Sequence, residues 1–323
     1  MNLGEARQIG RTQLALPVLG LGGSTLGGFG VPVTATEDET RAAYEAAWEV
    51  GFRYFDTAPR YGNGESRLGH ALRGHPRNSF MLSTKVGITR DLPPAGTQLR
   101  VECNYGYDAT LRSIDASLRR LRTDRLEIVF IHDIGPQTHG RAGWPTRFRE
   151  AMDGAYPALK RLRSEGVVQA IGVGVNSCAV CVACLKAADF DVFMLAGRYT
   201  LLDQGAAAEL LPLCRSRGAS IVVAAPFNSG ILATGARNGA RYDERPAKPE
   251  TFGKVSAIEA VCAEHAVSLG AAAVQFPLTH PVVAAVVPGP RNADQIREVA
   301  GWFAEPIPEA LWRGFKHALV VRS

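Results

Sequence analysis

The chain has 323 residues, of which 46% are hydrophobic and 21% charged, and its formal net charge is +5. This composition is typical of a globular protein, and the scattered charges, without a basic tail, argue against a nucleic-acid or membrane partner. No signal peptide and no apolar run of the roughly 18 residues that span a bilayer is found, so we expect a cytoplasmic protein with reduced cysteines.

Short apolar runs alternate with amphipathic stretches along almost the whole chain. A β-hairpin is expected first, over Arg7–Leu16, with its turn at Gly10 and Arg11. Eight runs follow that are apolar almost throughout, which is typical of parallel strands covered on both faces. The predicted strands are Val18–Leu21, Phe52–Asp56, Phe80–Lys85, Leu126–Ile131, Val168–Val173, Val192–Leu195, Ser220–Ala225 and Val282–Val287.

Helical patterns fill the gaps between these strands. Thr36 and Glu39 form a capping box before a helix that Gly51 would end. Eight βα units in series predict a single (β/α)8 TIM barrel over residues 1–323. A doubly wound sheet is the alternative, although no predicted strand leads through Gly-x-Gly-x-x-Gly into a helix. The other predicted helices are Glu65–Arg73, Asp108–Arg122, Phe148–Glu165, Ser177–Ala187, Ala206–Arg217, Val255–Ser268 and Ala293–Phe303.

Three connections are too long to be simple joints, namely residues 86–107, 133–147 and 226–254. Each follows a predicted strand, so all three are expected at the carboxyl face of the barrel, where functional loops gather.

Four chemically reactive side chains occupy or closely follow the carboxyl ends of three predicted strands. They are Asp56, Tyr61, Lys85 and His132. A free tyrosine has a pKa of about 10, and lowering it to about 7 requires roughly 4 kcal/mol of preferential phenolate stabilisation. A nearby lysine ammonium can supply much of this, and a carboxylate can keep the lysine charged. An Asp–Lys ion pair with a tyrosine packed beside it is the structural alternative.

A metal site is suggested only weakly, by Cys178, Cys181 and Cys184, which recur every three residues. They lie in a predicted helix, where cysteine often packs as a small hydrophobic residue. Since no fourth ligand is near in the sequence, we expect packing and no metal.

The motif Asp56-Thr57-Ala58-x-x-Tyr61-Gly62, the strand end Ser83-Thr84-Lys85 and the strand ending in His132 resemble the aldo-keto reductase superfamily. The resemblance covers nearly the whole chain. It implies that Tyr61 is the general acid/base, that Asp56 and Lys85 tune it, and that His132 orients the substrate. It also implies a nicotinamide cofactor that lies across the barrel mouth without a Rossmann fold.

The resemblance implies cofactor contacts at several matching positions. Asn176 matches an asparagine that holds the nicotinamide amide, although Val175 replaces the usual serine. Ala224 stands where some branches have an aromatic residue that stacks on the nicotinamide. The remaining implied contacts are Gly22 near the N-terminus and, in the loop after Pro226, Phe227, Ser229, Gly230 and Leu232.

The run from Pro288 to Ala293 resembles the family's site for the adenosine phosphate, and a helix N-terminus suits phosphate on physical grounds. Branches that prefer NADPH have a lysine and an arginine where this chain has Gly289 and Gln295. Arg291 compensates in part. NAD is therefore the expected cofactor, with NADP as the alternative.

Finer likeness, around His132 and Gly172–Asn176, points to the branch that contains the L-fucose (D-threo-aldose), L-galactose and pyridoxal 4-dehydrogenases. The resemblance implies oxidation of an aldose of the L-fucose, L-galactose or D-arabinose type at its anomeric carbon to a lactone. Asp133, His139 and Arg198 are candidates for binding sugar hydroxyls. The alternatives are pyridoxal oxidation, NADPH-dependent aldehyde or ketone reduction, and a non-catalytic nicotinamide-binding subunit. The expected partner is a small-molecule sugar or aldehyde, and the protein is expected to be a monomer or a small homo-oligomer.

Overall fold

A computed structural model describes residues 1–29, 35–91 and 100–320 of the chain. All eight predicted barrel strands are present and form one parallel sheet in the order β14-β11-β10-β9-β8-β5-β4-β3. A parallel bridge between Leu19 and Val286 joins the two ends of the sheet, so the barrel closes. The strands are β3 (Leu21–Gly22), β4 (Tyr54–Asp56), β5 (Met81–Val86), β8 (Leu126–His132), β9 (Val168–Val175), β10 (Val192–Ala196), β11 (Ser220–Ala224) and β14 (Val283–Val287).

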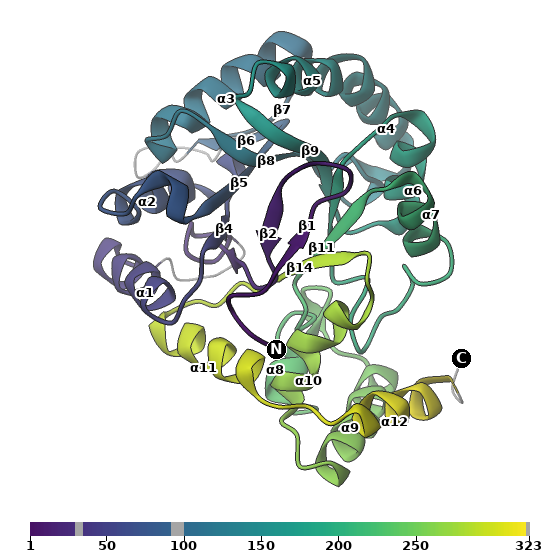
Figure 1. Ribbon diagram of the computed structural model, residues 1–323. Helices are drawn as coiled ribbons and strands as arrows, with labels where there is room; N and C mark the ends of the chain where they lie inside the picture. The colour runs from purple at the N-terminus through teal and green to yellow at the C-terminus, as the bar shows by residue number, and fades with distance from the viewer. Residues whose placement is uncertain (30–34, 92–99, 321–323) are drawn as a thin grey trace.

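Helices surround this barrel on the outside (Figure 1). The capping box is confirmed at the start of the first helix, where Thr36 and Glu39 exchange hydrogen bonds. The helices that alternate with the strands are α1 (Glu37–Glu49), α2 (Gly64–Ala71), α3 (Tyr107–Leu121), α5 (Tyr156–Ser164), α6 (Cys178–Ala187), α7 (Leu210–Arg217), α10 (Leu269–Gln275) and α11 (Ala293–Ala304). Two further helices, α9 (Pro249–Glu264) and α12 (Glu309–Val320), pack against each other beside this ring (Figure 1).

The expected N-terminal hairpin consists of β1 (Ala6–Gln8) and β2 (Ala15–Pro17) and crosses the amino end of the barrel (Figure 1). Its side chains Ile9, Leu14 and Leu16 are buried in one apolar cluster with the inward-facing Tyr54 and Phe130. The hairpin therefore fills the floor of the barrel, and the carboxyl face is left for the site.

The long connections contain regular structure that the sequence patterns did not reveal. The first holds the hairpin β6 (Ile88–Asp91) and β7 (Arg100–Cys103), and the third holds α8 (Ile231–Thr234) and the hairpin β12 (Arg241–Tyr242) and β13 (Arg245–Pro246). The second is α4 (Pro136–Glu150), whose conformation breaks at Gly140 with a φ of 69°. A π-helical segment, Ala151–Ala155, then joins α4 to α5, so the helix expected to begin at Phe148 begins earlier.

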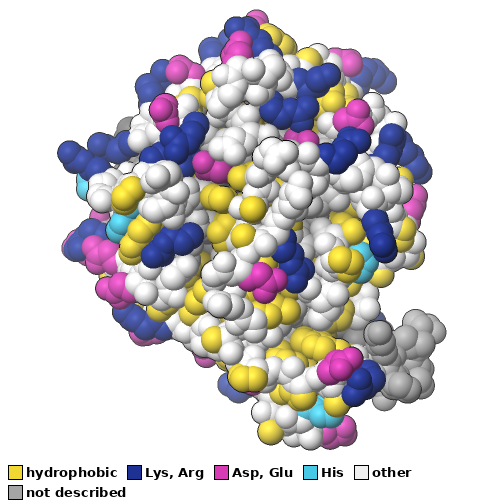
Figure 2. Space-filling model, in the orientation of Figure 1, with side chains coloured by type: hydrophobic (Ala, Val, Ile, Leu, Met, Phe, Trp, Pro, Cys, Tyr) yellow, Lys and Arg dark blue, Asp and Glu magenta, His cyan; other side chains and the backbone are white. Residues whose placement is uncertain are grey.

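Three general features bear on the expected partners. On the face shown in Figure 2, basic and acidic side chains are interspersed around the rim. Within the described ranges, no single helix is long and apolar enough to cross a membrane, and one pair of helices that reaches this length together is bent by 102°. The six cysteines are free thiols, and no cluster of three or more potential ligands for a metal ion occurs in the described part of the chain.

Candidate active site

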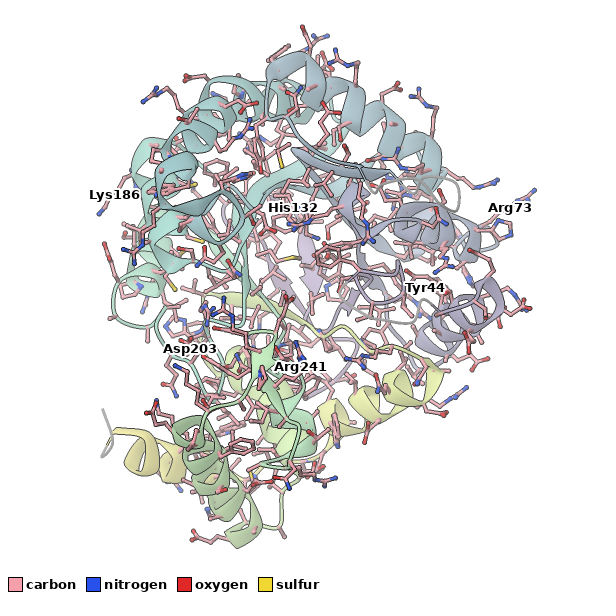
Figure 3. All side chains as sticks on the ribbon, turned by 180° about the vertical axis from the view of Figure 1, so that it is seen from behind. Tyr44, Arg73, His132, Lys186, Asp203 and Arg241 are labelled. Carbon is pink, nitrogen blue, oxygen red and sulfur yellow. The ribbon has the colours of Figure 1, made fainter. Side chains whose placement is uncertain are left out.

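The strand register brings the four predicted catalytic residues together at the carboxyl face. Asp56 at the end of β4 lies opposite Ser83 of β5, and Lys85 lies opposite Phe130 of β8. His132 ends β8, near the centre of the ring of helices when the molecule is viewed from this face (Figure 3). Tyr61 ends a 3-10 turn, Pro59–Tyr61, that begins three residues after the end of β4. Three neighbouring strand ends and one turn therefore form a single cluster.

Lys85 and Asp56 form a buried ion pair. The Nζ atom of Lys85 lies 2.5 Å from Oδ2 of Asp56 and donates a second hydrogen bond, of 3.0 Å, to the carbonyl of Thr57. Ser83 donates its hydroxyl to the other carboxylate oxygen at 2.7 Å. Burial raises the pKa of Asp56, while Lys85 and the Ser83 hydroxyl oppose this rise. The pKa of Lys85 is also raised, because the attraction of Asp56 and Tyr61 outweighs the effect of burial.

Tyr61 lies beside both the ammonium and the imidazole. The Lys85 Nζ is 5.0 Å from the centroid of the Tyr61 ring, and the rings of Tyr61 and His132 are 5.7 Å apart and nearly perpendicular. Burial raises the pKa of Tyr61, and this effect is larger than the lowering of the pKa by Lys85. The negative charges of Asp56 and Asp133 raise the pKa further. Lys85 therefore lowers the pKa of this phenol, as expected, but burial opposes its effect.

His132 is a neutral imidazole. It is buried, and burial together with the positive charges of Lys85 and Arg60 holds its pKa well below the ordinary value. Its Nδ1 atom has no hydrogen-bond partner among the described residues. A buried neutral imidazole with unused hydrogen-bonding capacity suits an uncharged substrate oxygen.

Sequence reasoning missed Arg60, although it directly precedes Tyr61. Its guanidinium lies 2.5 Å from Oδ2 of Asp133, and this oxygen is 3.8 Å from Nε2 of His132. The guanidinium also lies over the ring of Phe29, with its carbon 4.9 Å from the ring centroid. An arginine in a turn between a strand end and the candidate acid/base was the signal available in the sequence.

Asp133 and His139 are two of the three predicted substrate-binding residues, and both belong to the site. His139 lies on α4, and its Nε2 is 3.0 Å from the hydroxyl of Tyr105. The same hydroxyl donates to the carbonyl of His132 at 2.8 Å. Burial lowers the pKa of His139. Tyr105 therefore connects His139 to the backbone at His132 and Asp133.

Arg198, the third predicted substrate residue, is held by protein groups. Its guanidinium lies 3.1 Å from Asp203 and 2.9 Å from Asp243, and its Nε donates to the carbonyl of Asn176 at 3.1 Å. Asp203 and Arg241 lie on the same side of the barrel mouth (Figure 3). Arg198 thus joins the end of β9 to the turn of the β12–β13 hairpin.

The predicted nicotinamide and pyrophosphate contacts lie along the same face. Gly22 ends β3, and its N–H donates to the carbonyl of Pro288 at 2.8 Å. Ser229 and Gly230 have φ values of 62° and 97°, so the chain turns tightly there, and a Cβ on Gly230 would meet only open space. Phe227 packs edge-on against Trp302. Leu232 is the exception, because its side chain is fully buried in an apolar cluster behind the loop.

The predicted adenosine-phosphate contacts surround the start of α11. Asn292 caps this helix by accepting a hydrogen bond from the N–H of Gln295, and the Gln295 side chain accepts one from the N–H of Arg291. Pro288 is buried, whereas Gly289 and Arg291 are exposed. A Cβ on Gly289 would make only ordinary contacts of 3.7 Å, so the position is open. These groups fit a cofactor phosphate at a helix N-terminus.

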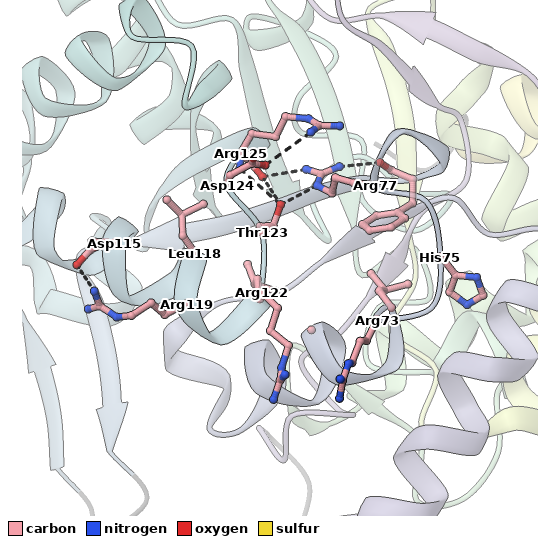
Figure 4. A pocket seen from close by; sticks show the side chains of 14 residues that line it. Arg73, His75, Arg77, Asp115, Leu118, Arg119, Arg122, Thr123, Asp124 and Arg125 are labelled. Atoms are coloured by element: carbon pink, nitrogen blue, oxygen red, sulfur yellow. Dashed lines mark hydrogen bonds and ion pairs between the residues drawn. The ribbon is translucent and has the colours of Figure 1, made fainter.

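A separate pocket of about 680 Å³ lies on the outer wall between α2 and α3 (Figure 4). Arg77 spans its floor and bonds to Thr123, to Glu127 and to the carbonyls of Phe80 and Arg125. None of the predicted catalytic, cofactor or substrate residues lines this pocket. The cluster at the barrel mouth is therefore the better candidate for chemistry.

Comparison with known proteins agrees with this geometry. The model of the Aldo/keto reductase family matches residues 18–318. Pyridoxal 4-dehydrogenase from Microbacterium luteolum is 39% identical and D-threo-aldose 1-dehydrogenase from Pseudomonas sp is 38% identical, each over 95% of both chains. The solved holo form of an aldo-keto reductase from Bacillus halodurans has a TM-score of 0.77 at 24% identity, covering 97% of this chain and 96% of that chain. This likeness confirms the TIM barrel.

Proposed function

The chain belongs to the aldo/keto reductase family, and we propose that it oxidises the anomeric carbon of an aldose to a lactone, with NAD as the hydride acceptor. The observation that carries the proposal is the polar surrounding of His132. The carboxylate of Asp133 lies 3.8 Å from Nε2 of the imidazole and is paired with Arg60, and a hydrophobic substrate would offer these charged groups no hydrogen-bond partner. The 38% identical relative named for an aldose dehydrogenase supports the same substrate class.

Each catalytic residue has a physical role in this proposal. Tyr61 accepts the proton of the anomeric hydroxyl as the carbon–oxygen double bond forms, and Lys85 stabilises the phenolate that is needed for this. Asp56 keeps Lys85 charged and fixed. His132 remains neutral and donates a hydrogen bond to the same substrate oxygen, which holds the anomeric carbon in a reactive position.

The cofactor would be held by Asn176, the loop that contains Ser229 and Gly230, and the N-terminus of α11. When bound, the nicotinamide supplies the acceptor for the hydride that leaves the anomeric carbon. We propose NAD rather than NADP because neither Gly289 nor Gln295 offers a cation, and the Gln295 side chain is already bonded to the backbone of Arg291. Arg291 is exposed and supplies one positive charge to the phosphate site.

Oxidation of pyridoxal is a second candidate, favoured by the 39% identical relative that carries this name. The same four residues would perform the same proton and hydride transfer on its cyclic hemiacetal. The two candidates differ in the groups beyond the reacting carbon, where a sugar presents several hydroxyls and pyridoxal presents an aromatic ring.

The experiment that tests the proposal is a panel of L-fucose, L-galactose, D-arabinose and pyridoxal with NAD+ and with NADP+, followed through the absorbance of the reduced cofactor. We expect the highest kcat/KM for an aldose with NAD+. A preference for pyridoxal would select the second candidate. Strict dependence on NADPH with simple aldehydes would contradict both, and NAD binding without any turnover would indicate a non-catalytic subunit.

A further inference from the structure

The Arg60–Asp133 pair has no role in the proton transfer, yet it lies beside the residue that holds the reacting oxygen. The Nη1 atom of Arg60 and the Oδ2 atom of Asp133 are 2.5 Å apart, and the two side chains are only 21% and 24% exposed. Among the described residues, the guanidinium makes no other hydrogen bond or ion pair. Arg60 therefore has N–H donors left over at the barrel mouth.

The distance between Asp133 and His132 fits two neighbouring substrate oxygens. A substrate oxygen that is hydrogen-bonded to Nε2 of His132 lies about 2.9 Å from this nitrogen. A hydroxyl on the next carbon of the substrate lies about one hydrogen-bond length from that oxygen. The Asp133 Oδ2 atom is 3.8 Å from Nε2, so it lies within reach of that second hydroxyl. A sugar with a hydrogen atom in place of this second hydroxyl would not form a hydrogen bond with the Asp133 carboxylate.

We propose that Arg60 and Asp133 together bind the hydroxyl on the carbon next to the anomeric carbon and so restrict the enzyme to aldoses that carry it. The carboxylate accepts the hydrogen of this hydroxyl, and the guanidinium donates to its oxygen. Hydrogen bonds to charged groups in a partly buried site discriminate strongly against analogues that lack the hydroxyl. This inference rests on the proposed function, because it assumes that the reacting oxygen lies on His132.

The backbone conformation at Asp133 indicates that this residue has a fixed position. Its φ is 51°, in the left-handed region that residues other than glycine seldom adopt. The N–H of Asp133 donates to the carbonyl of Gly174 at 2.8 Å, and Tyr105 donates to the preceding carbonyl, that of His132. These hydrogen bonds hold the backbone of Asp133 in this conformation, in which its Oδ2 atom lies 3.8 Å from Nε2 of His132.

The test compares L-fucose with 2-deoxy-L-fucose as substrates of the wild-type enzyme and of the variants Arg60→Met and Asp133→Asn, with NAD+ at saturation. The wild type should prefer L-fucose by about ten- to a hundredfold in kcat/KM. Each variant should lose most of this preference by losing activity on L-fucose, mainly through KM, while its activity on the deoxy sugar changes less. Either variant suffices if the other fails to fold.

The control is Arg163→Met. Arg163 forms an ion pair of the same length, 2.5 Å, with Asp191, away from the predicted site residues, and should keep the wild-type preference. A preference that persists in Arg60→Met and Asp133→Asn overturns the inference, as does equal loss on both sugars. If the wild type oxidises no aldose, both the proposed function and this inference fail. If the wild type oxidises aldoses and the two variants keep its preference for L-fucose over the deoxy sugar, only this inference is overturned.

Discussion

The ammonium of Lys85 lies 2.5 Å from the carboxylate of Asp56, and the two side chains are only 2% and 5% exposed. Removing one charge of such a pair leaves the other buried and uncompensated, which typically costs about 3–5 kcal/mol. We expect Asp56→Ala to lower the free energy of unfolding by about this amount, measured by urea denaturation.

The double variant Asp56→Asn/Lys85→Met should recover most of this stability without recovering activity, because it removes both charges. Asp115→Asn is the matched control. It breaks an exposed pair with Arg119 and should change stability by less than about 1 kcal/mol. Equal losses of stability on breaking the buried and the exposed pair would contradict a stabilising role for the Asp56–Lys85 ion pair.

Tyr61→Phe removes the group that accepts the proton and leaves the packing of the ring in place. Loss of a general acid/base costs about a hundred- to ten-thousandfold in rate, so kcat should fall by about this factor. Binding of NAD, followed by fluorescence titration, should stay within about twofold of the wild type. Tyr199→Phe, at a ring that packs against Phe276, serves as the control and should retain activity. Near-normal turnover of Tyr61→Phe would refute the role of the phenol.

The pH profile follows from the direction of the pKa of Tyr61. Burial raises it above the ordinary value of about 10, and oxidation needs the deprotonated phenol, whose fraction grows as pH increases toward that pKa. We expect kcat/KM for aldose oxidation to rise steadily from about pH 7 to about pH 10. The pKa of His132 is well below its ordinary value, so the imidazole should add no inflection near pH 6.5. A maximum at neutral pH would show that bound cofactor or substrate reverses the shift.

Tyr105→Phe tests the support behind His132. The Tyr105 hydroxyl donates to the His132 carbonyl at 2.8 Å and contacts His139, so its loss frees the segment that positions the imidazole. We expect about a tenfold fall in kcat with little change in NAD binding. Tyr156→Phe removes a similar bond, of 3.2 Å to the carbonyl of Asp189, at the surface and should leave kcat unchanged. Equal effects of the two substitutions would mean that the hydroxyl has no positioning role.

Cofactor preference should respond to charges added at the start of α11. Gly289→Lys combined with Gln295→Arg places two cations beside Arg291, and the open surroundings of Gly289 can accommodate the longer side chain. Charge-assisted hydrogen bonds to a phosphate should raise kcat/KM for NADP+ relative to NAD+ by about ten- to a hundredfold. The substitution Arg297→Lys, two residues beyond Gln295 on α11, keeps the charge and serves as the control. An unchanged ratio would place the adenosine phosphate elsewhere.

The barrel was predictable because its signal is repeated. Eight apolar runs with helical stretches between them identify the strands, and residues at the ends of parallel strands must meet at one edge. Asp56, Lys85 and His132 could therefore be placed together without any knowledge of loop structure. Tyr61 followed because only four residues separate it from Asp56.

The features that sequence reasoning missed depend on tertiary contacts. The contact between Arg60 and Asp133 joins residues 73 positions apart, and no periodic pattern reports it. Arg198 forms ion pairs with Asp203 and Asp243, and the pair with Asp243 depends on the conformation of the third long connection. The raised pKa of Tyr61 was missed for a different reason, because the sequence shows the neighbouring ammonium and gives no measure of the burial that outweighs it.

The hairpin at the barrel floor also constrains the order in which the molecule can assemble. Arg7 donates to the carbonyls of Leu278 and Val283, which are synthesised 271 and 276 residues later. While the ribosome is still producing the chain, the apolar side chains of this hairpin have no finished barrel in which to dock. Such long sequence separations slow folding, because the intervening chain must be ordered before the contact stabilises it. The floor of the barrel can close only after its last strand has emerged.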